Sequence, residues 1–122
     1  MNANLAYSVE RIGPLHSVYV GSGRSGTLSD VDKEEILATC AARFTSFTYL
    51  EAQGYFRGLS EHSLVIQIAS SSPSEIIHLA YDIALSRSQL GVGVASPDAN
   101  GITVYQRVIP RKDPSLSDHQ RL

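Results

Sequence analysis

The residues best suited to chemistry lie in a glycine-rich loop at Gly21–Gly26, where three glycines stand in G-x-G-x-x-G order around Arg24. Backbone N–H groups crowded into such a loop can bind an anion, and a guanidinium can add a bidentate contact. We expect this loop to bind an anionic ligand, with a flexible surface connection as the alternative. The expected ligand-binding residues of the loop are Gly21, Ser22, Gly23, Arg24, Ser25 and Gly26.

The loop lacks the context of two known nucleotide-binding motifs. A dinucleotide-binding helix begins inside the glycine run, whereas the better helix start here is Ser29 or Asp30. Glu51, the acidic residue after the next apolar segment, lies further along than the roughly 20 residues of that motif. No Gly-Lys-Ser/Thr sequence occurs, which excludes a Walker loop.

Histidines offer an alternative, catalytic interpretation. The four are scattered at His16, His62, His78 and His119, without the H-x-x-x-H or H-E-x-x-H spacing of a metal site. His16 and His62 stand at or beside strand starts and would be neighbours if their strands pair. A small hydrolase or isomerase could then use these histidines for catalysis. His78 and Asp82 have i, i+4 spacing, which is more typical of helix stabilisation than of a catalytic dyad.

Composition narrows the class of protein. The chain has 122 residues, which is enough for one domain. Its formal charge of −2 lacks the basic character that nucleic-acid or membrane binding requires. Its single cysteine, Cys40, excludes an intramolecular disulfide and a cysteine-based metal cluster, and is expected inside a helix as a small buried side chain. Residues 1–4 lack the pattern of a signal peptide, so we expect a cytoplasmic protein. We also expect no metal or cofactor.

Alternating hydrophobic patterns and turn signals predict two helices among several strands. The expected strands are Leu5–Ile12, Leu15–Val20, Phe47–Arg57, Ser63–Ala69, Leu90–Ala95 and Ile102–Val108; the expected helices are Ser29–Phe44 and one with Ser72 as N-cap and Pro73 in its first turn. This order predicts an α+β, ferredoxin-like β-α-β-β-α-β domain over residues 1–109, with an extra strand at each end. Two helices would cover one face of an antiparallel sheet. Residues 110–122 are expected to be a disordered tail.

The strand at Phe47–Arg57 has two different sets of side chains. Small and apolar residues alternate with aromatic and polar ones, and we expect the first set to pack beneath the helices. The second set, on the open face, includes Tyr49, Tyr55 and Arg57 as candidate ligand contacts. The alternative is that the same face mediates self-association, and the two interpretations are compatible.

The segment Val18–Tyr105 resembles a small bacterial domain family of unknown function with a ferredoxin-like fold. The resemblance lies in Tyr19–Ser22 and in Arg43–Arg57. The run Phe47–Gly54 is also similar to the second strand of PII-like signalling proteins, which are ferredoxin-like trimers that bind nucleotides between subunits. Their long ligand-sensing loop is reduced here to Gly58–Glu61, so their ligand residues are not carried over.

Together these observations predict a non-catalytic, homo-oligomeric protein that binds a small anionic, nucleotide-like ligand. It would sense a signal or sequester one, as small phage proteins that absorb host immune nucleotides do. The glycine loop would bind phosphate, and the open face would supply stacking and charge. Two alternatives stay open: a small hydrolase or isomerase using His16 or His62, and a protein-interaction module using the open sheet face.

Overall fold

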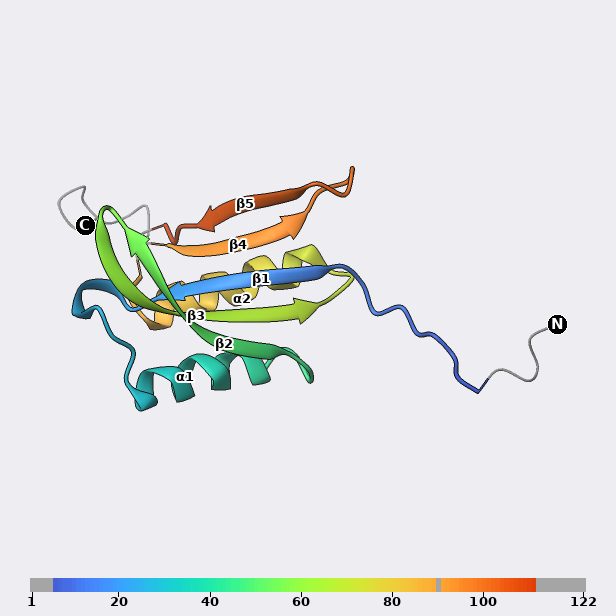
Figure 1. Ribbon diagram of the computed structural model, residues 1–122, viewed down its shortest axis with the longest axis horizontal. Helices are drawn as coiled ribbons and strands as arrows, with labels where there is room; N and C mark the ends of the chain where they lie inside the picture. The colour runs from blue at the N-terminus through green and yellow to red at the C-terminus, as the bar shows by residue number, and fades with distance from the viewer. Residues whose placement is uncertain (1–5, 90, 112–122) are drawn as a thin grey trace.

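A computed structural model describes residues 6–89 and 91–111, apart from the side chain of Arg24. Its elements are β1 (Leu15–Gly21), a 3-10 turn (Gly23–Ser25), α1 (Asp30–Ala41), β2 (Thr48–Phe56), β3 (Leu59–Ala69), α2 (Pro73–Ser86), β4 (Val92–Pro97) and β5 (Thr103–Val108). The strands form one antiparallel sheet in the order β2-β3-β1-β4-β5, and both helices lie on the same face of it (Figure 1). The predicted α+β, ferredoxin-like arrangement is confirmed, with β5 as an additional strand after β4.

Both helices begin where the sequence predicts. Ser29 caps α1 in a capping box: its side chain accepts from the backbone N–H of Asp32, and the Asp32 carboxylate accepts from the backbone N–H of Ser29. Pro73 occupies the first turn of α2, where its missing N–H is not needed. The first helix ends at Ala41, three residues earlier than expected; beyond it the Arg43 N–H bonds to the Cys40 carbonyl three residues back, in a tighter turn than that of an α-helix.

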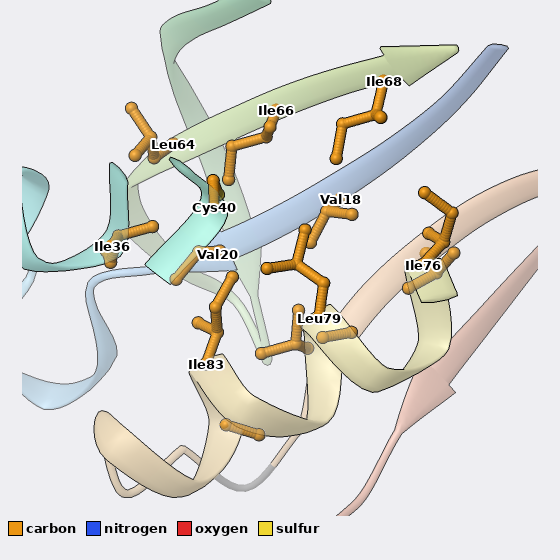
Figure 2. Close-up of a cluster of buried hydrophobic side chains, with 14 of the residues drawn as sticks. Val18, Val20, Ile36, Cys40, Leu64, Ile66, Ile68, Ile76, Leu79 and Ile83 are labelled. Atoms are coloured by element: carbon orange, nitrogen blue, oxygen red, sulfur yellow. The ribbon is translucent and has the colours of Figure 1, made fainter. Parts of the chain in front are cut away.

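The hydrophobic core lies between the helices and one face of the sheet. Figure 2 shows alternate residues of β1 and β3 pointing at the inner faces of α1 and α2. The inner face of α2 consists of five buried apolar residues with helical spacing; they are Ile76, Leu79, Ala80, Ile83 and Ala84. Cys40 is buried in the same core, as expected, and desolvation raises the pKa of its thiol to about 11. This core fixes which face of the sheet remains open.

Strand register corrects the expected orientation of β2. Directly paired residues share a face of a sheet, and Tyr49 and Glu51 pair with Ile66 and Leu64, whose side chains belong to the buried core. The set containing Tyr49 and Tyr55 therefore lies on the helix side, opposite to the prediction. The open face instead carries the set that includes Leu50 and Phe56. Both sets contain apolar side chains, so alternation alone did not identify the inner one.

The prediction of an N-terminal strand at Leu5–Ile12 is wrong for the residues of this range that the structure describes. Residues 6–14 form no strand and extend away from the sheet in Figure 1, while Leu5 lies outside the described residues. Gly13 adopts φ +148° against the backbone of Ser70, so close that a Cβ there would lie 2.5 Å from the Ser70 carbonyl carbon. This contact directs the chain away from the sheet edge before a strand could pair.

Within the described residues, neither helix is long and apolar enough to cross a membrane. Most of the predicted tail, residues 112–122, lies outside the described part of the chain.

Candidate functional site

The glycine loop leaves the end of β1 and returns to the start of α1. Gly23 and Gly26 both have positive φ, at 70° and 75°, so these positions require glycine for the backbone path itself. The Ser25 hydroxyl lies 3.2 Å from the Ser22 carbonyl and 2.8 Å from that of Thr27, which ties the turn to itself. Among the described residues, the buried Ser22 Oγ has no hydrogen-bond partner. The loop is therefore ordered by its own residues and retains an unsatisfied hydroxyl.

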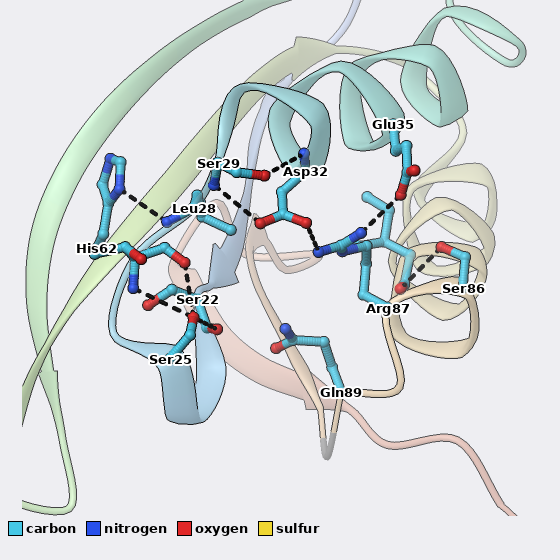
Figure 3. A network of polar contacts seen from close by, with 12 residues as sticks. Ser22, Ser25, Leu28, Ser29, Asp32, Glu35, His62, Ser86, Arg87 and Gln89 are labelled. Carbon is cyan, nitrogen blue, oxygen red and sulfur yellow. Dashed lines mark hydrogen bonds and ion pairs between the residues drawn. The ribbon is translucent and has the colours of Figure 1, made fainter.

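Two residues from other elements anchor this loop. Gln89, which follows α2, donates from Nε2 to the Gly21 carbonyl at 3.0 Å. His62 of β3 donates its backbone N–H to the Gly26 carbonyl at 3.1 Å and accepts the Leu28 N–H at Nδ1, at 3.2 Å. The loop is therefore held at its start and at its end, and Figure 3 shows the contact between His62 and Leu28.

On the helix side, His62 continues into a chain of charged groups. Because Nδ1 accepts a hydrogen bond from the Leu28 amide, the proton of the neutral imidazole lies on Nε2, which is 2.8 Å from Glu51 Oε1. Glu51 also accepts from Lys33 at 3.2 Å. Hydrogen bonds from Lys33 and then His62 lower the pKa of Glu51, and the bond to Glu51 raises the pKa of Lys33.

A second polar cluster joins the two helices beside the loop. Arg87, just after α2, forms ion pairs with Asp32 and, at 2.8 Å, with Glu35, both on α1 (Figure 3). The backbone N–H of Ser29 and then Arg87 hold the pKa of Asp32 below its ordinary value. Because Asp32 also closes the capping box, this cluster fixes the start of α1 directly after the loop.

On the open face, at the same end of the sheet, larger side chains lie over the backbones of two glycines, Gly21 and Gly93, and this surface is called the glycine bed. Glu61 of β3 covers Gly21, and a Cβ at Gly21 would lie 2.4 Å from its Oε1. Tyr105 of β5 covers Gly93 in the same way, and its ring meets Tyr19 edge-on with centroids 5.8 Å apart. Among the described side chains, which do not include that of Arg24, the half-buried Glu61 carboxylate forms no ion pair.

The β2–β3 hairpin brings the two edges of the sheet together over this bed. Its far end rises past the end of β1 toward β5 (Figure 1), and the guanidinium of Arg107 lies 5.3 Å from the centroid of the Phe56 ring. Phe56 and Arg107 belong to the outermost strands β2 and β5. The open face at this end of the sheet therefore combines the Glu61 carboxylate with aromatic side chains of three strands, an arrangement suited to a ligand that carries both a positive charge and a flat ring.

The remaining predicted site residues do not gather at this bed. Tyr49 lines a hollow of about 260 Å³ between α1 and β2, together with Lys33 and Glu51. Tyr55 is 80% exposed near the tip of the hairpin, and Arg57 is in the turn itself, with φ 53° and its guanidinium 5.2 Å from the Phe56 ring centroid. A ligand role for these three residues stays a prediction.

The expected histidine pair does not form. β1 and β3 are neighbours, but the register places His16 opposite Ile68, six residues along β3 from His62, or about 20 Å. His16 is fully buried between Ser96 Oγ, at 2.7 Å, and the Ser70 carbonyl, at 3.0 Å, as a structural residue. A site using both histidines is therefore wrong.

Other polar candidates have structural partners. Asp82 pairs with Arg43 at 2.8 Å, rather than with His78. In the part of the chain that the structure describes, no cluster of three His, Cys, Asp or Glu side chains could hold a metal ion. Sequence reasoning missed Glu61, which it placed in a hairpin connection. The signal was Gly21, the glycine of the neighbouring strand that Glu61 covers, and this relation is visible only once the strands are paired.

Comparison with known proteins gives a fold relationship. No family model and no curated protein matches this sequence. Phage SAM lyases share its fold. A phage SAM lyase in complex with S-methyl-5′-thioadenosine matches with a TM-score of 0.65 and 16% identity, over 87% of this chain and 96% of that one. A phage SAM lyase in the apo state matches with a TM-score of 0.62 and 16% identity, over 88% and 99%.

These matches change the expected function. They contradict the prediction of a non-catalytic protein that senses or sequesters a signal, because the similar structures are enzymes. They agree with the coarser expectation of a small nucleotide-like ligand, since the matched lyase binds a thioadenosine. The resemblance to a family of unknown function gains no matching family model, and no link to PII-like proteins is found.

Proposed function

We propose that this chain is an enzyme that binds S-adenosylmethionine (SAM) and cleaves it to S-methyl-5′-thioadenosine. The observation that carries the proposal is the match, over nearly the whole of both chains, to a SAM lyase that holds this thioadenosine. One fold can support many activities, so the residues of this chain must also suit the reaction.

The chemistry sets clear requirements. The substrate carries a positively charged sulfonium, whereas the thioadenosine product is neutral. When the S–Cγ bond breaks, its electron pair goes to sulfur. If the carboxylate of the substrate itself attacks Cγ, a C–O bond forms as S–Cγ breaks, and a lactone leaves without consuming water. The protein then needs to hold the sulfonium, stack the adenine and bend the methionine chain, rather than supply a nucleophile.

Glu61 is the residue best placed to hold the sulfonium. Its carboxylate lies on the open face at the first glycine of the loop, half-buried and without an ion pair among the described residues. Tyr19 and Tyr105 are on the same face, where aromatic rings can contact both a cation and an adenine ring. Arg107, over Phe56, lines the opposite edge of this bed.

The glycine loop, Gly21–Gly26, is proposed to bind the negative part of the substrate. Neither SAM nor the thioadenosine contains phosphate, so the anion would be the amino-acid carboxylate rather than the phosphate first expected. Loop N–H groups, the unsatisfied Ser22 hydroxyl and Arg24 would supply the donors. The substrate carboxylate bound by this loop would lie near Glu61, and the sulfonium would lie between the two carboxylates.

We also propose that the protein is a homo-oligomer. Leu50, Tyr19 and Tyr105 leave 44%, 38% and 61% of their surface exposed on or beside the open face, more apolar surface than a single bound ligand would cover. A second copy against this face would exclude water from the reacting sulfonium. Native mass spectrometry would show the subunit number directly.

The test is to incubate the purified protein with SAM and to quantify the thioadenosine by chromatography. We expect Glu61→Gln to lower the rate by about 100-fold or more, since it removes an electrostatic contact to the reacting group. Glu75→Gln, on the exposed first turn of α2, is the matched control and should leave the rate unchanged. A wild-type protein that neither forms nor binds the thioadenosine would overturn the proposal.

A further inference from the structure

We propose that His62 is a positioning residue, whose neutral imidazole holds the glycine loop in its binding form and whose protonation releases the loop. The effect on ligand binding rests on the proposed function, but the contact itself can be tested without a ligand. His62 thereby links two regions that the sequence treats as separate, the loop and the charged groups between α1 and β2.

Three contacts of one residue support this role. The backbone N–H of His62 donates to Gly26, and its Nδ1 accepts from Leu28, so both bonds hold the return half of the loop. The third contact, from Nε2 to Glu51 at 2.8 Å, fixes the orientation of the ring. The imidazole is thus held on both nitrogens, and its tautomer is set by the backbone N–H of Leu28.

Protonation changes only one of these contacts from favourable to unfavourable. A charged imidazole has a proton on both nitrogens, so Nδ1 can no longer accept the Leu28 N–H. The charged groups facing the ring are Glu51 on β2, which favours the cation, and behind it Lys33 and Asp30 on α1. The bond to Glu51 therefore survives, and of the two bonds between His62 and the return half of the loop only the backbone bond to Gly26 remains.

Two substitutions separate the two ring nitrogens. His62→Asn places an amide oxygen close to the position of Nδ1, so it can accept the Leu28 N–H but does not reach Glu51. His62→Gln extends further, so it can donate to Glu51 but leaves Leu28 unpaired. Neither side chain titrates, and both variants keep the backbone bond to Gly26.

The experiment is amide hydrogen exchange by NMR on the ligand-free protein, from about pH 8 to about pH 5, the range in which imidazole commonly titrates. For the wild type, we expect the protection factor of the Leu28 amide to fall about fivefold to tenfold on acidification, the loss of one hydrogen bond. His62→Asn should stay protected at every pH, and His62→Gln should be unprotected at every pH.

Equal Leu28 protection in the two variants, or a wild type whose protection does not change with pH, would overturn the inference. Binding of S-methyl-5′-thioadenosine is then measured on the same three proteins. Affinity should weaken on acidification in the wild type, stay constant in His62→Asn and be low throughout in His62→Gln. If the NMR pattern holds but no protein binds the thioadenosine, the proposed function fails and the role of His62 in the loop stands.

Discussion

Glu61 and His62 are consecutive residues of β3, yet they face opposite sides of the sheet and have opposite surroundings. His62 contacts Leu28 and Glu51 through its ring, and Glu51 is in turn paired with Lys33. Glu61 lies on the bare backbone of Gly21, with no ion pair to any described side chain, a set that excludes that of Arg24. Both ring nitrogens of His62 are therefore hydrogen-bonded, whereas the Glu61 carboxylate has no charged partner among the described side chains.

The difference separates residues that shape the site from residues that can serve a ligand. A polar group with all its partners in place stabilises one local conformation, and losing a partner costs free energy. A half-buried carboxylate without a counterion can still form an ion pair with a ligand. We therefore expect changes on the open face to alter turnover, and changes on the helix side to alter stability and loop order.

The largest effect in this comparison is expected from Gly21→Ala. The new methyl group would occupy the position of the Glu61 carboxylate, 2.4 Å from Oε1, so the side chain must move while the backbone need not. We expect thioadenosine formation to fall about 10- to 100-fold, because small misplacements of a reacting contact are costly. The melting temperature should change little.

Gly54→Ala is the matched control for that substitution. Gly54 is on the open face of the same hairpin, but a Cβ there would be 3.7 Å from Ser63 Oγ, an ordinary contact. Turnover should stay close to that of the wild type. Equal losses in the two variants would mean that the loss in Gly21→Ala does not come from the displacement of the Glu61 carboxylate, since Gly54 also pairs with Glu61 but leaves it in place.

A smaller effect is expected from removing aromatic rings. Tyr105→Ala deletes the ring over Gly93 and should weaken thioadenosine binding by about tenfold, the typical contribution of one stacked base. Tyr55→Ala, near the hairpin tip, tests the residue that the sequence favoured. Calorimetry on both variants decides between the two faces: a greater loss for Tyr55→Ala would restore the sequence-based site.

On the helix side, Asp32→Asn should change acid stability. The native pKa of Asp32 is lowered below its ordinary value of 3.8, first by the Ser29 backbone N–H. Its contribution to stability is therefore present above about pH 4 and is lost as the pH falls through the native pKa. In urea unfolding, the variant should be less stable than the wild type near neutral pH, and the difference should shrink as the pH falls below about 4 toward the lowered native pKa.

Asp30→Asn provides the comparison for Asp32→Asn, because the Asp30 side chain is 94% exposed and its ion pair with Lys33 is on the surface. Such pairs contribute little, so unfolding should be nearly unchanged at every pH. A difference between wild type and Asp32→Asn that is the same at pH 3 and pH 7 would contradict the electrostatic explanation.

The smallest effect on turnover is expected from Cys40→Ala, which is on neither face. The buried thiol has its pKa raised to about 11, so it should not react with thiol reagents in the native protein near neutral pH. Removing it should lower the stability by about 1 kcal/mol and leave turnover unchanged. Rapid modification of native wild-type protein would show that the core opens more readily than its packing implies.

Some of the fold could be predicted because local signals agreed with the final packing. Pro73 after a serine run marks the start of α2, and the spacing from Ile76 to Ala84 identifies its inner face. Ser29 and Asp32 form the cap that the acidic first turn suggested. The glycine loop was also found, because positive φ at Gly23 and Gly26 is a local backbone requirement.

The inner face of β2 could not be predicted in the same way. Alternation in a strand defines two faces, but it identifies the buried one only when the two sets differ clearly in polarity. In β2, Leu50 and Phe56 compete with Tyr49 and Tyr55, and pairing with Ile66 of β3 decided the outcome. The same cause hid Glu61, whose environment is made by Gly21 on another strand.

The sequence by itself therefore determined the order of helices and strands, the α2 core face and the existence of the glycine loop, because each follows from interactions a few residues apart. Only the tertiary structure decided that His62 anchors the loop, that His16 lies far from His62, and that Glu61 lies over Gly21 on the open face. Those relations depend on strand register, and a shift of one residue would exchange the two faces and separate every one of these side chains.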